Sequence, residues 1–471
     1  MIDTAKIKAN ILSCAFKGML VDFNVEKSNK ALDELHKENK KYVPVKEDEY
    51  LTEVPSRWQW SRLGYVTNNH GQKEPQEDFC YIDVGTLDNI NHCLAKKENL
   101  VNKEEAPSRA RKIVEQGDVL YSTVRPYLHN ICIINKDFSR MPVASTAFCV
   151  MAVEEKVLIN KYLFYWLLSP EFDKFSNGNP SKGTLYPAIG EKDLLNGVIP
   201  IPDIEEQKLI VEKLDSAFEH LDKLNRLQTQ YSSDLEVLKL KIIDAGIRGK
   251  LTEQLPEDGT AEELLEQIAE EKKQLIKEKK IKSSKALPEI TEDEIPFTIP
   301  NNWKFVRIGD VCEFNPKNDL SDDLEVSFIP MACVTEGYNN KHSFEIRKWG
   351  EIKKGFNHFQ NNDVGVAKIT PCFQNRKSVV FRDLLEGYGA GTTELSIVRG
   401  YEGMICPDYL LWFFKSVYFI SNGIESFTGV VGQQRIHKDY LKMCVLPLPP
   451  YLEQLRIADK INSAIAAVVN M

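Results

Sequence analysis

Long hydrophobic runs are missing from this sequence of 471 residues. The apolar run YLFYWLL at 162–168 is far shorter than the roughly 20 residues that a membrane-spanning helix needs. The N-terminal stretch MIDTAKIKANILSCAFKG has charges spread along it and lacks the apolar core of a secretory signal. We therefore expect a soluble, cytoplasmic protein with no membrane partner.

Paired metal-ligand motifs are also missing. The chain has ten cysteines but no Cys-x-x-Cys pair, and its eight histidines are dispersed without a His-x-x-x-His pattern. Scattered cysteines in a long chain of this type are typical of reduced, buried thiols. We predict no disulfide framework and no bound metal.

Motifs for catalysis are equally scarce. A methyltransferase acting on an amino group would need Asn or Asp before Pro-Pro-aromatic, and the nearest match, Leu448-Pro449-Pro450-Tyr451, has leucine in that place. No glycine-rich cofactor loop follows a predicted strand, and GIRGKL at 246–251 lacks the spacing of a phosphate-binding loop. We predict that this chain alone catalyses no reaction and binds no cofactor.

Negative charge is unevenly placed along the chain. The net charge of −9 at first argues against a nucleic-acid partner. However, residues 54–202 and residues 303–446 each carry 17 basic and 17 acidic groups, whereas residues 203–302 carry 15 basic and 23 acidic groups. The acidity therefore lies mainly in the middle, and two neutral blocks can present local basic faces.

An internal repeat organises the sequence. VPSRWQWSRLGYV (54–66) matches IPNNWKFVRIGDV (299–311), and GDVLYSTVRP (117–126) matches NDVGVAKITP (362–371), both at an offset of 245 residues. IPIPDIEEQKLIVEKL (199–214) matches LPLPPYLEQLRIADKI (446–461) at an offset of 247, with six identical positions. A period this long indicates a duplicated domain rather than a solenoid.

The repeat predicts an α+β fold. Two tandem mixed α/β domains would be joined and separated by long antiparallel coiled-coil helices, in a pseudo-twofold internal repeat. The expected parts are an N-terminal helical segment (1–52), a first domain (53–202), a central pair of long helices (203–290), a second domain (291–449) and a C-terminal helix (450–471).

Heptad spacing marks the first long helix. Asp203 and Glu206 are placed as a capping box, and a helix from Asp203 to Ile247 would be about 65 Å long. Its seam has the spacing of a coiled coil, which predicts a partner helix. The seam residues are Ile210, Leu214, Ala217, Leu221, Leu224, Gln228, Tyr231, Leu235, Leu238, Ile242 and Ala245. If the two terminal helices together mimic one such helix, they fall one heptad short.

This organisation resembles the specificity subunit of Type I restriction–modification systems. The resemblance covers essentially the whole chain and rests on GDVLYSTVRP, on Gly-Lys-Leu-Thr at 249–252 and on the two helix starts. The residues shared by those helix starts are Pro200, Pro202, Glu206, Gln207, Ile210 and Lys213, and Pro447, Pro449, Glu453, Gln454, Ile457 and Lys460.

The resemblance implies a non-catalytic DNA-binding subunit. Each mixed domain would be a target-recognition domain that reads one half of a split site in double-stranded DNA, and the helices would set the distance between the halves. It also implies two methylation subunits on the helical region, with restriction subunits joining later. S-adenosylmethionine, ATP and Mg²⁺ would be bound by those partners, and the methylated base would be adenine.

Basic and amide side chains are the candidates for DNA contact, because phosphates attract cations and base edges need paired donors and acceptors. In the first domain these are Arg109, Arg111, Lys112, Arg125 and Asn130, with Lys182, Thr184 and Tyr186 in a second loop. In the second domain they are Lys368, Gln374, Asn375, Arg376 and Lys377, with Gln433, Gln434 and Arg435 in the matching loop. Ordinary solvated surface charge is the alternative reading for these residues.

Differences between the repeats predict an asymmetric target. Lys368 and Thr370 stand where the first domain has Thr123 and Arg125, so one scaffold presents different side chains. The competing hypothesis is a structural coiled-coil scaffold with two protein-binding domains. A self-contained methyltransferase is disfavoured because its motifs are missing.

Overall fold

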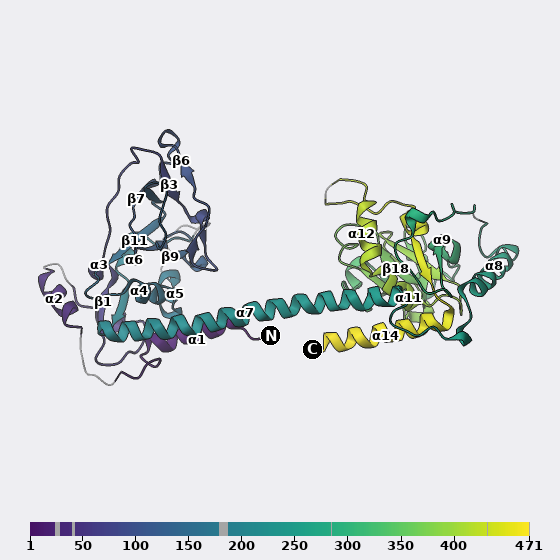
Figure 1. The fold of residues 1–471 in the computed structure, drawn as a ribbon, viewed down its shortest axis with the longest axis horizontal. Helices are drawn as coiled ribbons and strands as arrows, with labels where there is room; N and C mark the ends of the chain where they lie inside the picture. The colour runs from purple at the N-terminus through teal and green to yellow at the C-terminus, as the bar shows by residue number, and fades with distance from the viewer. Residues whose placement is uncertain (24–28, 40–42, 179–186, 284, 431, 471) are drawn as a thin grey trace. The chain divides into compact units, whose positions relative to one another are not determined.

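The computed structural model describes residues 1–471 except 24–28, 40–42, 179–186, 284, 431 and 471. The chain forms two compact units, unit 1 at Met1–Thr229 and unit 2 at Gln230–Met471. Helix α7 (Ile204–Ile247) begins in unit 1 and ends in unit 2 (Figure 1). In both units a mixed α/β domain is combined with helices.

Unit 1 contains two four-stranded sheets. One has the order β6-β3-β10-β7 and the other β2-β11-β8-β9. The strands of the first sheet are β6 (Leu100–Val101), β3 (Phe79–Ile82), β10 (Pro142–Ser145) and β7 (Ala110–Ile113). Those of the second are β2 (Thr67–Asn68), β11 (Phe148–Val153), β8 (Val119–Ser122) and β9 (Ile131–Ile133). β3 and β10 are parallel, and the other pairs are antiparallel.

Unit 2 repeats this topology, with the orders β16-β15-β20-β17 and β14-β21-β18-β19. The first sheet has β16 (Glu345–Lys348), β15 (Glu325–Ile329), β20 (Tyr388–Gly391) and β17 (Asn357–Gln360). The second has β14 (Cys312–Phe314), β21 (Leu395–Gly400), β18 (Val364–Ala367) and β19 (Ser378–Val380). The parallel pair, β15 with β20, occupies the same place as β3 with β10.

Short elements complete each domain in the same chain order. A two-stranded sheet joins the start and end of each domain, β1 (Gln59–Arg62) with β12 (Val198–Ile201) and β13 (Lys304–Arg307) with β22 (Val445–Leu448). Unit 1 also has a β4 (Leu87–Asp88) and β5 (Cys93–Leu94) pair. The helices of unit 1 are α2 (Lys30–Glu38), α3 (Leu63–Val66), α4 (Asn160–Leu167), α5 (Pro170–Gly178) and α6 (Glu191–Leu195). Those of unit 2 are α8 (Ala261–Lys277), α9 (Ile308–Val311), α10 (Trp349–Ile352), α11 (Pro407–Phe414), α12 (Val417–Glu425) and α13 (Tyr440–Met443).

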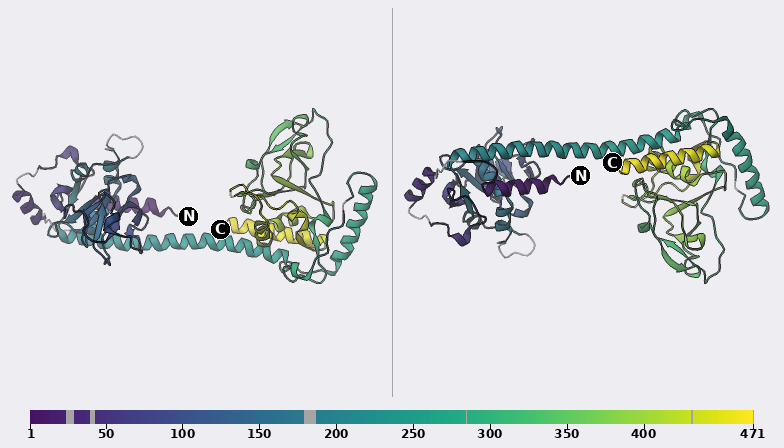
Figure 2. Two further views of the ribbon diagram at one scale, coloured as in Figure 1. Left: turned by 90° about the horizontal axis from the view of Figure 1, so that it is seen from above. Right: turned by 90° about the horizontal axis from the view of Figure 1, so that it is seen from below.

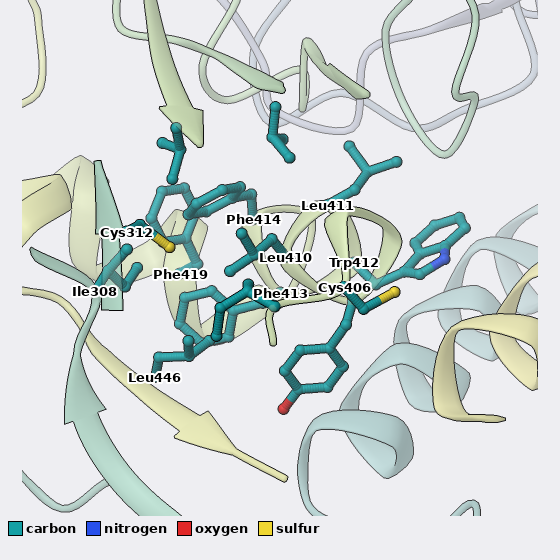
Figure 3. Packing of buried hydrophobic residues seen from close by; sticks show 14 of the residues in the cluster. Ile308, Cys312, Cys406, Leu410, Leu411, Trp412, Phe413, Phe414, Phe419 and Leu446 are labelled. Carbon is teal, nitrogen blue, oxygen red and sulfur yellow. The ribbon is translucent and has the colours of Figure 1, made fainter. Parts of the chain in front are cut away.

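The main core of unit 2 surrounds α11, in which the six consecutive residues from Tyr409 to Phe414 are all buried. Leu410, Phe413 and Phe414 are completely buried and pack against Phe419 of α12 and Leu446 of β22 (Figure 3). A helix that is hydrophobic all round has to be enclosed. α4 has the corresponding place in the main core of unit 1, where Trp166 is fully buried.

Two further helices pack on α7, one in each unit. α1 (Thr4–Phe16) lies along the first part of α7, where Lys8 pairs with Asp222 at 2.5 Å and the Ile2 backbone bonds the side chain of Gln228 (Figure 1). α14 (Tyr451–Val469) lies along the last part, where its Ile457 and Ile461 share a core with Ile243 (Figure 2).

The predicted seam of α7 is buried at its start and is half-buried or exposed from Ala217 onward. Ile210 and Leu214 are completely buried against unit 1, whereas Tyr231 and Leu238 are 47% and 41% exposed. The second helix of the predicted central pair, α8, packs Leu264 and Ile268 into the core of unit 2. The heptad pattern therefore overstates how much of α7 is covered within this chain.

Buried glutamines explain the repeated Glu-Gln at the start of α7 and α14. Gln207 donates to the carbonyls of Val157 (2.8 Å) and Pro202 (3.1 Å) and accepts from the amide of Ile159. Such bonds satisfy backbone groups that the turn from strand into helix would otherwise leave unpaired.

Gln454 makes the matching three bonds, with the carbonyls of Met404 and Pro449 and the amide of Cys406. Both glutamine side chains are completely buried. The two segments that the sequence repeats are thus held by the same hydrogen-bonding device.

The adjacent glutamates have different partners. Glu206 is fully buried and accepts two hydrogen bonds from Arg57, at 2.6 and 3.1 Å, rather than returning to the helix start as the predicted capping box requires. Asp203 instead accepts from the amide of Glu205. Glu453 accepts from the Trp303 indole at 2.8 Å and from Thr252 at 3.0 Å.

No helix within the described part of the chain is long and apolar enough to cross a membrane.

Candidate nucleic-acid interface

Three segments meet at one end of the second sheet in unit 1, and we call them loop cluster 1: residues 123–125, Ala147 and residues 187–189. Thr123 donates its amide to Ala147 O (2.8 Å), Ile189 donates to Thr123 O (2.9 Å), and Arg125 donates to Pro187 O (2.8 Å). These bonds bring the segment after β8 together with the residue before β11 and the segment before α6.

Loop cluster 2 comprises residues 368–370, Glu394 and residues 434–436 of unit 2, and has the same backbone bonds. Lys368 donates to Glu394 O (2.9 Å), Ile436 donates to Lys368 O (3.1 Å), and Thr370 donates to Gln434 O (2.9 Å). The offsets of 245 and 247 found in the sequence place these residues opposite those of loop cluster 1. The two clusters therefore present different side chains from one backbone arrangement.

A tight turn leads into the strand that carries each cluster. Gly117 has φ +95° and Asn362 has φ +71°, which are left-handed conformations that glycine and asparagine tolerate. Asp118 accepts from the amide of Glu115 (2.7 Å), and Asp363 accepts from that of Gln360 (2.8 Å). The Gly-Asp and Asn-Asp pairs of the repeat are therefore turn residues.

The predicted residues of unit 1 lie in different surroundings. Arg125 is in loop cluster 1, with a left-handed φ of +50°. Arg109 is exposed, and its carbonyl accepts from Thr146, next to that cluster. Asn130 is 6% exposed, and its carbonyl accepts from Ser122. Lys182, Thr184 and Tyr186 lie outside the described residues.

Two predicted cations of unit 1 have acidic partners. Arg111 pairs with Glu74 at 2.8 Å and also donates to the Ser108 carbonyl. Lys112 is 4% exposed and donates to both carboxylate oxygens of Glu191, at 2.7 and 2.8 Å. Because its partner neutralises it within the fold, Lys112 supplies less free positive charge than Arg109.

The structure divides the first predicted group of unit 2, because Lys368 lies with the second group. Lys368, Gln434 and Arg435 lie in loop cluster 2, and Gln433 is exposed beside it. Arg435 is held side-on by Glu394, whose carboxylate accepts from Nη2 at 2.7 Å and from Nε at 3.0 Å. The Arg435 hydrogen bonds lower the pKa of Glu394, so this carboxyl stays ionised.

Gln374, Asn375 and Arg376 instead border a cavity of about 390 Å³ that α7 also lines through Glu236 and Lys239. Gln374 is half-buried in its wall, and Asn375 donates to Glu336 at 3.1 Å. Arg376 lies over the ring of Tyr338, and Lys239 approaches that ring as well. Lys377 donates to the Met331 carbonyl at 3.4 Å.

A buried lysine holds the wall of this cavity. Lys415 is completely buried, and its Nζ donates to the carbonyls of Gly337 (2.7 Å) and Arg376 (2.9 Å). Arg376 in turn donates to the Lys415 carbonyl at 3.0 Å. Burial, with a smaller effect of the Arg376 charge, lowers the pKa of Lys415 to about 7.

The depressed pKa predicts a rise in stability with pH. Between pH 7 and 10 the unfolded chain keeps the Lys415 proton while the folded unit releases it, so the free energy of unfolding increases by up to about 1.4 kcal/mol per pH unit. Below pH 7 both states hold the proton, and this contribution is at its minimum. Urea titrations at pH 7, 8 and 9 should show the rise in the parent chain and in a Lys438→Met control at an exposed lysine, and lose it in Lys415→Met. Parallel pH profiles for all three would contradict the assignment.

Two functional candidates escaped the sequence interpretation, Glu394 and Lys415. The Glu394 amide donates to Thr392 Oγ1 at 3.2 Å. Nothing in the sequence marks Lys415 as buried. Among the described residues, no group of three or more His, Cys, Asp or Glu side chains is arranged to hold a metal ion.

Comparison with known proteins identifies the family. The model of the Type I restriction modification DNA specificity domain matches residues 55–231 and residues 300–469. The chain therefore belongs to this family and carries two copies of its domain, which confirms the family resemblance and the tandem arrangement predicted from the sequence.

Among its relatives is the Type I restriction enzyme EcoAI specificity subunit of Escherichia coli, 41% identical over 257 residues, which are 53% of this chain and 44% of that protein. The EcoEI specificity subunit of Escherichia coli is 42% identical over 224 residues, which are 47% of this chain and 38% of that protein. The matches thus span less than half the length of these two relatives.

Solved structures share the fold. The HsdS subunit from Thermoanaerobacter tengcongensis aligns with a TM-score of 0.51 and 22% identity, covering 89% of this chain and 92% of that chain. A chain from a study of complex assembly and conformational transition of the type I R-M system aligns with a TM-score of 0.62 and 22% identity, covering 89% and 93%.

Proposed function

We propose that this chain is the DNA sequence-specificity subunit of a Type I restriction–modification complex. The observation that supports it most is the pair of loop clusters, where three matching backbone bonds display different charged and polar side chains. The family match and the names of the relatives support the same function. Each domain would be a target-recognition domain that reads one half of a bipartite site.

The difference between the clusters makes the target asymmetric. Loop cluster 1 carries Thr123, Arg125 and Ala147 where loop cluster 2 carries Lys368, Thr370 and Glu394. Base edges in the major groove are distinguished by the pattern of donors and acceptors opposite them. Two domains with different patterns at equivalent positions would therefore recognise different half-sites.

The helices would set the distance between the half-sites. α7 has 44 residues, about 66 Å of helix, and α1 and α14 each run antiparallel to it. We propose that these helices act as a coiled-coil spacer within a pseudo-twofold repeat. Leu227, Tyr231 and Val237 leave apolar surface exposed on α7, which suits the docking of other subunits.

Catalysis would belong to those other subunits. Two methylation subunits would dock on the helical region and bring S-adenosylmethionine to the adenines, and restriction subunits would add ATP- and Mg²⁺-dependent cleavage. This chain would bind none of these cofactors itself and would act on DNA in the cytoplasm.

Two assays test this division of roles. The complex with methylation subunits should shift a duplex carrying the target site, with an affinity that falls steeply as salt rises. The chain alone, incubated with DNA and labelled S-adenosylmethionine, should transfer no methyl group, whereas the complex should. Transfer by the chain alone would contradict the absence of catalysis. If the complex does not bind duplex DNA even at low salt, the result would instead favour a protein-binding scaffold.

A further inference from the structure

A charged triad occupies loop cluster 2: Lys368, Glu394 and Arg435. The backbone of Arg435 forms two hydrogen bonds with the backbone of Thr428, at 2.9 and 3.0 Å. Arg435 also forms a β-bridge with Ile369. Lys368 and Glu394 are joined directly through their backbones. The three side chains therefore start from segments that are fixed relative to one another.

The hydrogen bonds of Arg435 leave one edge of its guanidinium available. A guanidinium has five N–H groups in a fixed plane. The Glu394 carboxylate accepts from Nε and Nη2, and the carbonyl of Gln433 accepts from Nη1 at 3.3 Å. Among the residues that the structure describes, no further partner takes the second N–H of either Nη atom, and a guanidinium can pair through two such N–H groups (the end-on fork) with the O6 and N7 acceptors of guanine.

The exposed fractions of the Arg435 and Glu394 side chains suit the recognition of a DNA base by Arg435. The Arg435 side chain is 47% exposed, whereas that of Glu394 is 28% exposed. A long flexible arginine loses rotamer freedom when it binds, and a side-on carboxylate removes part of that loss in advance. Lys368 is half-buried beside them and keeps the cluster net positive despite the carboxylate.

Loop cluster 1 lacks this arrangement although its backbone is the same. Thr123 stands in the place of Lys368, and Ala147 in that of Glu394, at the same hydrogen bond. The β-bridge between Val124 and Ala188 matches that between Ile369 and Arg435, so Ala188 replaces the arginine. A carboxylate-held arginine is therefore a feature of unit 2 at this position.

We propose that Arg435 reads a guanine in the half-site of unit 2 and that Glu394 is the positioning residue that aims its end-on fork at the base. This assignment rests on the proposed DNA-specificity function. Arg435, Glu394 and Lys368 would then together determine the specificity of unit 2. Ala188, at the equivalent position of unit 1, would not read a guanine.

The test uses the full chain in complex with methylation subunits and duplexes selected from a randomised pool at one salt concentration. Arg435→Ala should weaken binding to the selected site by about 5- to 150-fold and remove the preference for one G·C pair, only in the half-site of unit 2. Arg435→Lys should keep the salt dependence and still lose that preference, because an ammonium has no fork.

Glu394→Gln separates positioning from charge. Removing a negative charge should tighten binding to all DNA if the effect is only electrostatic. If Glu394 aims Arg435, discrimination at the same base pair should instead fall, with the other positions unchanged. Glu345→Gln and Arg347→Ala are matched controls, because this pair on β16 is also exposed and bonded at 2.7 Å.

These experiments give different results if the assignment of Arg435 is wrong and if the proposed DNA-specificity function is wrong. The unchanged half-site of unit 1 serves as the internal control for folding and assembly in every variant. If Arg435→Ala and Glu394→Gln leave the selected motif intact, the assignment of a guanine reader is wrong, while sequence-specific binding by the parent complex still supports the proposed function. If the parent complex selects no motif at all, the proposed function itself fails.

Discussion

Replacing Gln454 by leucine should lower the free energy of unfolding of unit 2 by about 3 to 5 kcal/mol. Leucine has a similar volume but cannot bond the Met404 and Pro449 carbonyls or the Cys406 amide. Each buried backbone group left without a partner costs about 1 to 3 kcal/mol. The loss is large because the Gln454 side chain is completely buried and water cannot easily replace it.

Gln207→Leu is the equivalent change in unit 1 and should have an effect of similar size, because it breaks the same three bonds with Val157, Pro202 and Ile159. Gln230→Leu is the matched control, since Gln230 is exposed and its side chain bonds its helix neighbour Asp234. The control should stay within about 0.5 kcal/mol of the parent. Urea denaturation measures all three. A Gln454→Leu loss below about 1 kcal/mol would show that the glutamine is not what holds the start of α14.

Deleting four residues from the exposed middle of α7 should abolish methylation at the parent site and create a new site with a shorter gap. Residues 230–233 suit the deletion, because Gln228 still bonds Ile2 and Lys239 still meets Tyr338 on either side of it. The helix becomes about 6 Å shorter and turns by about 40°. Successive base pairs of DNA are about 3.4 Å apart and are rotated by about 35° from one another. The loss of about 6 Å of helix length therefore corresponds to about two base pairs, and the rotation of the helix by about 40° corresponds to about one.

The gap should therefore shorten by one or two base pairs while both half-site sequences stay the same. Mapping modified bases in cells that express the variant with methylation subunits measures both quantities. A matched control replaces residues 230–233 by four alanines, which keeps the helix length and should keep the gap. If the deletion changed the half-site sequences, the helices could not be acting as spacers.

The internal repeat was the strongest guide that the sequence contained. The offset of 245 residues at Thr123 and Lys368 and the offset of 247 at Ala147 and Glu394 reappear as equivalent hydrogen bonds. The two extra residues of unit 2 lie between these points, in the segment from β18 to β21. The pattern was readable because Gln207 and Gln454 satisfy equivalent backbone groups in the two domains with the same residue type.

Side-chain partners were beyond prediction because they come from distant parts of the chain. Glu206 looked like half of a capping box, yet its partner Arg57 is 149 residues away. The charge of Lys112 predicts DNA contact, yet its partner Glu191 is 79 residues away. Residue type alone could not show which cations are already paired within the fold.

The heptad periodicity predicted helix α7 but did not predict which parts of its apolar seam are buried. The seam of α7 predicted one long helix, and α7 is continuous over 44 residues. The same period could not reveal that Tyr231 and Leu238 on this seam are 47% and 41% exposed. A heptad pattern indicates which face is apolar, not whether a partner from the same chain is long enough to cover it.

The most direct test of the central proposal is to map modified adenines across the genome of cells that express this chain with its methylation subunits. We predict one asymmetric motif made of two different short sequences separated by a gap of fixed length, and no modification when the chain is omitted. An unbroken or symmetric motif, or the same modification pattern without this chain, would contradict the proposal that its two domains read two half-sites.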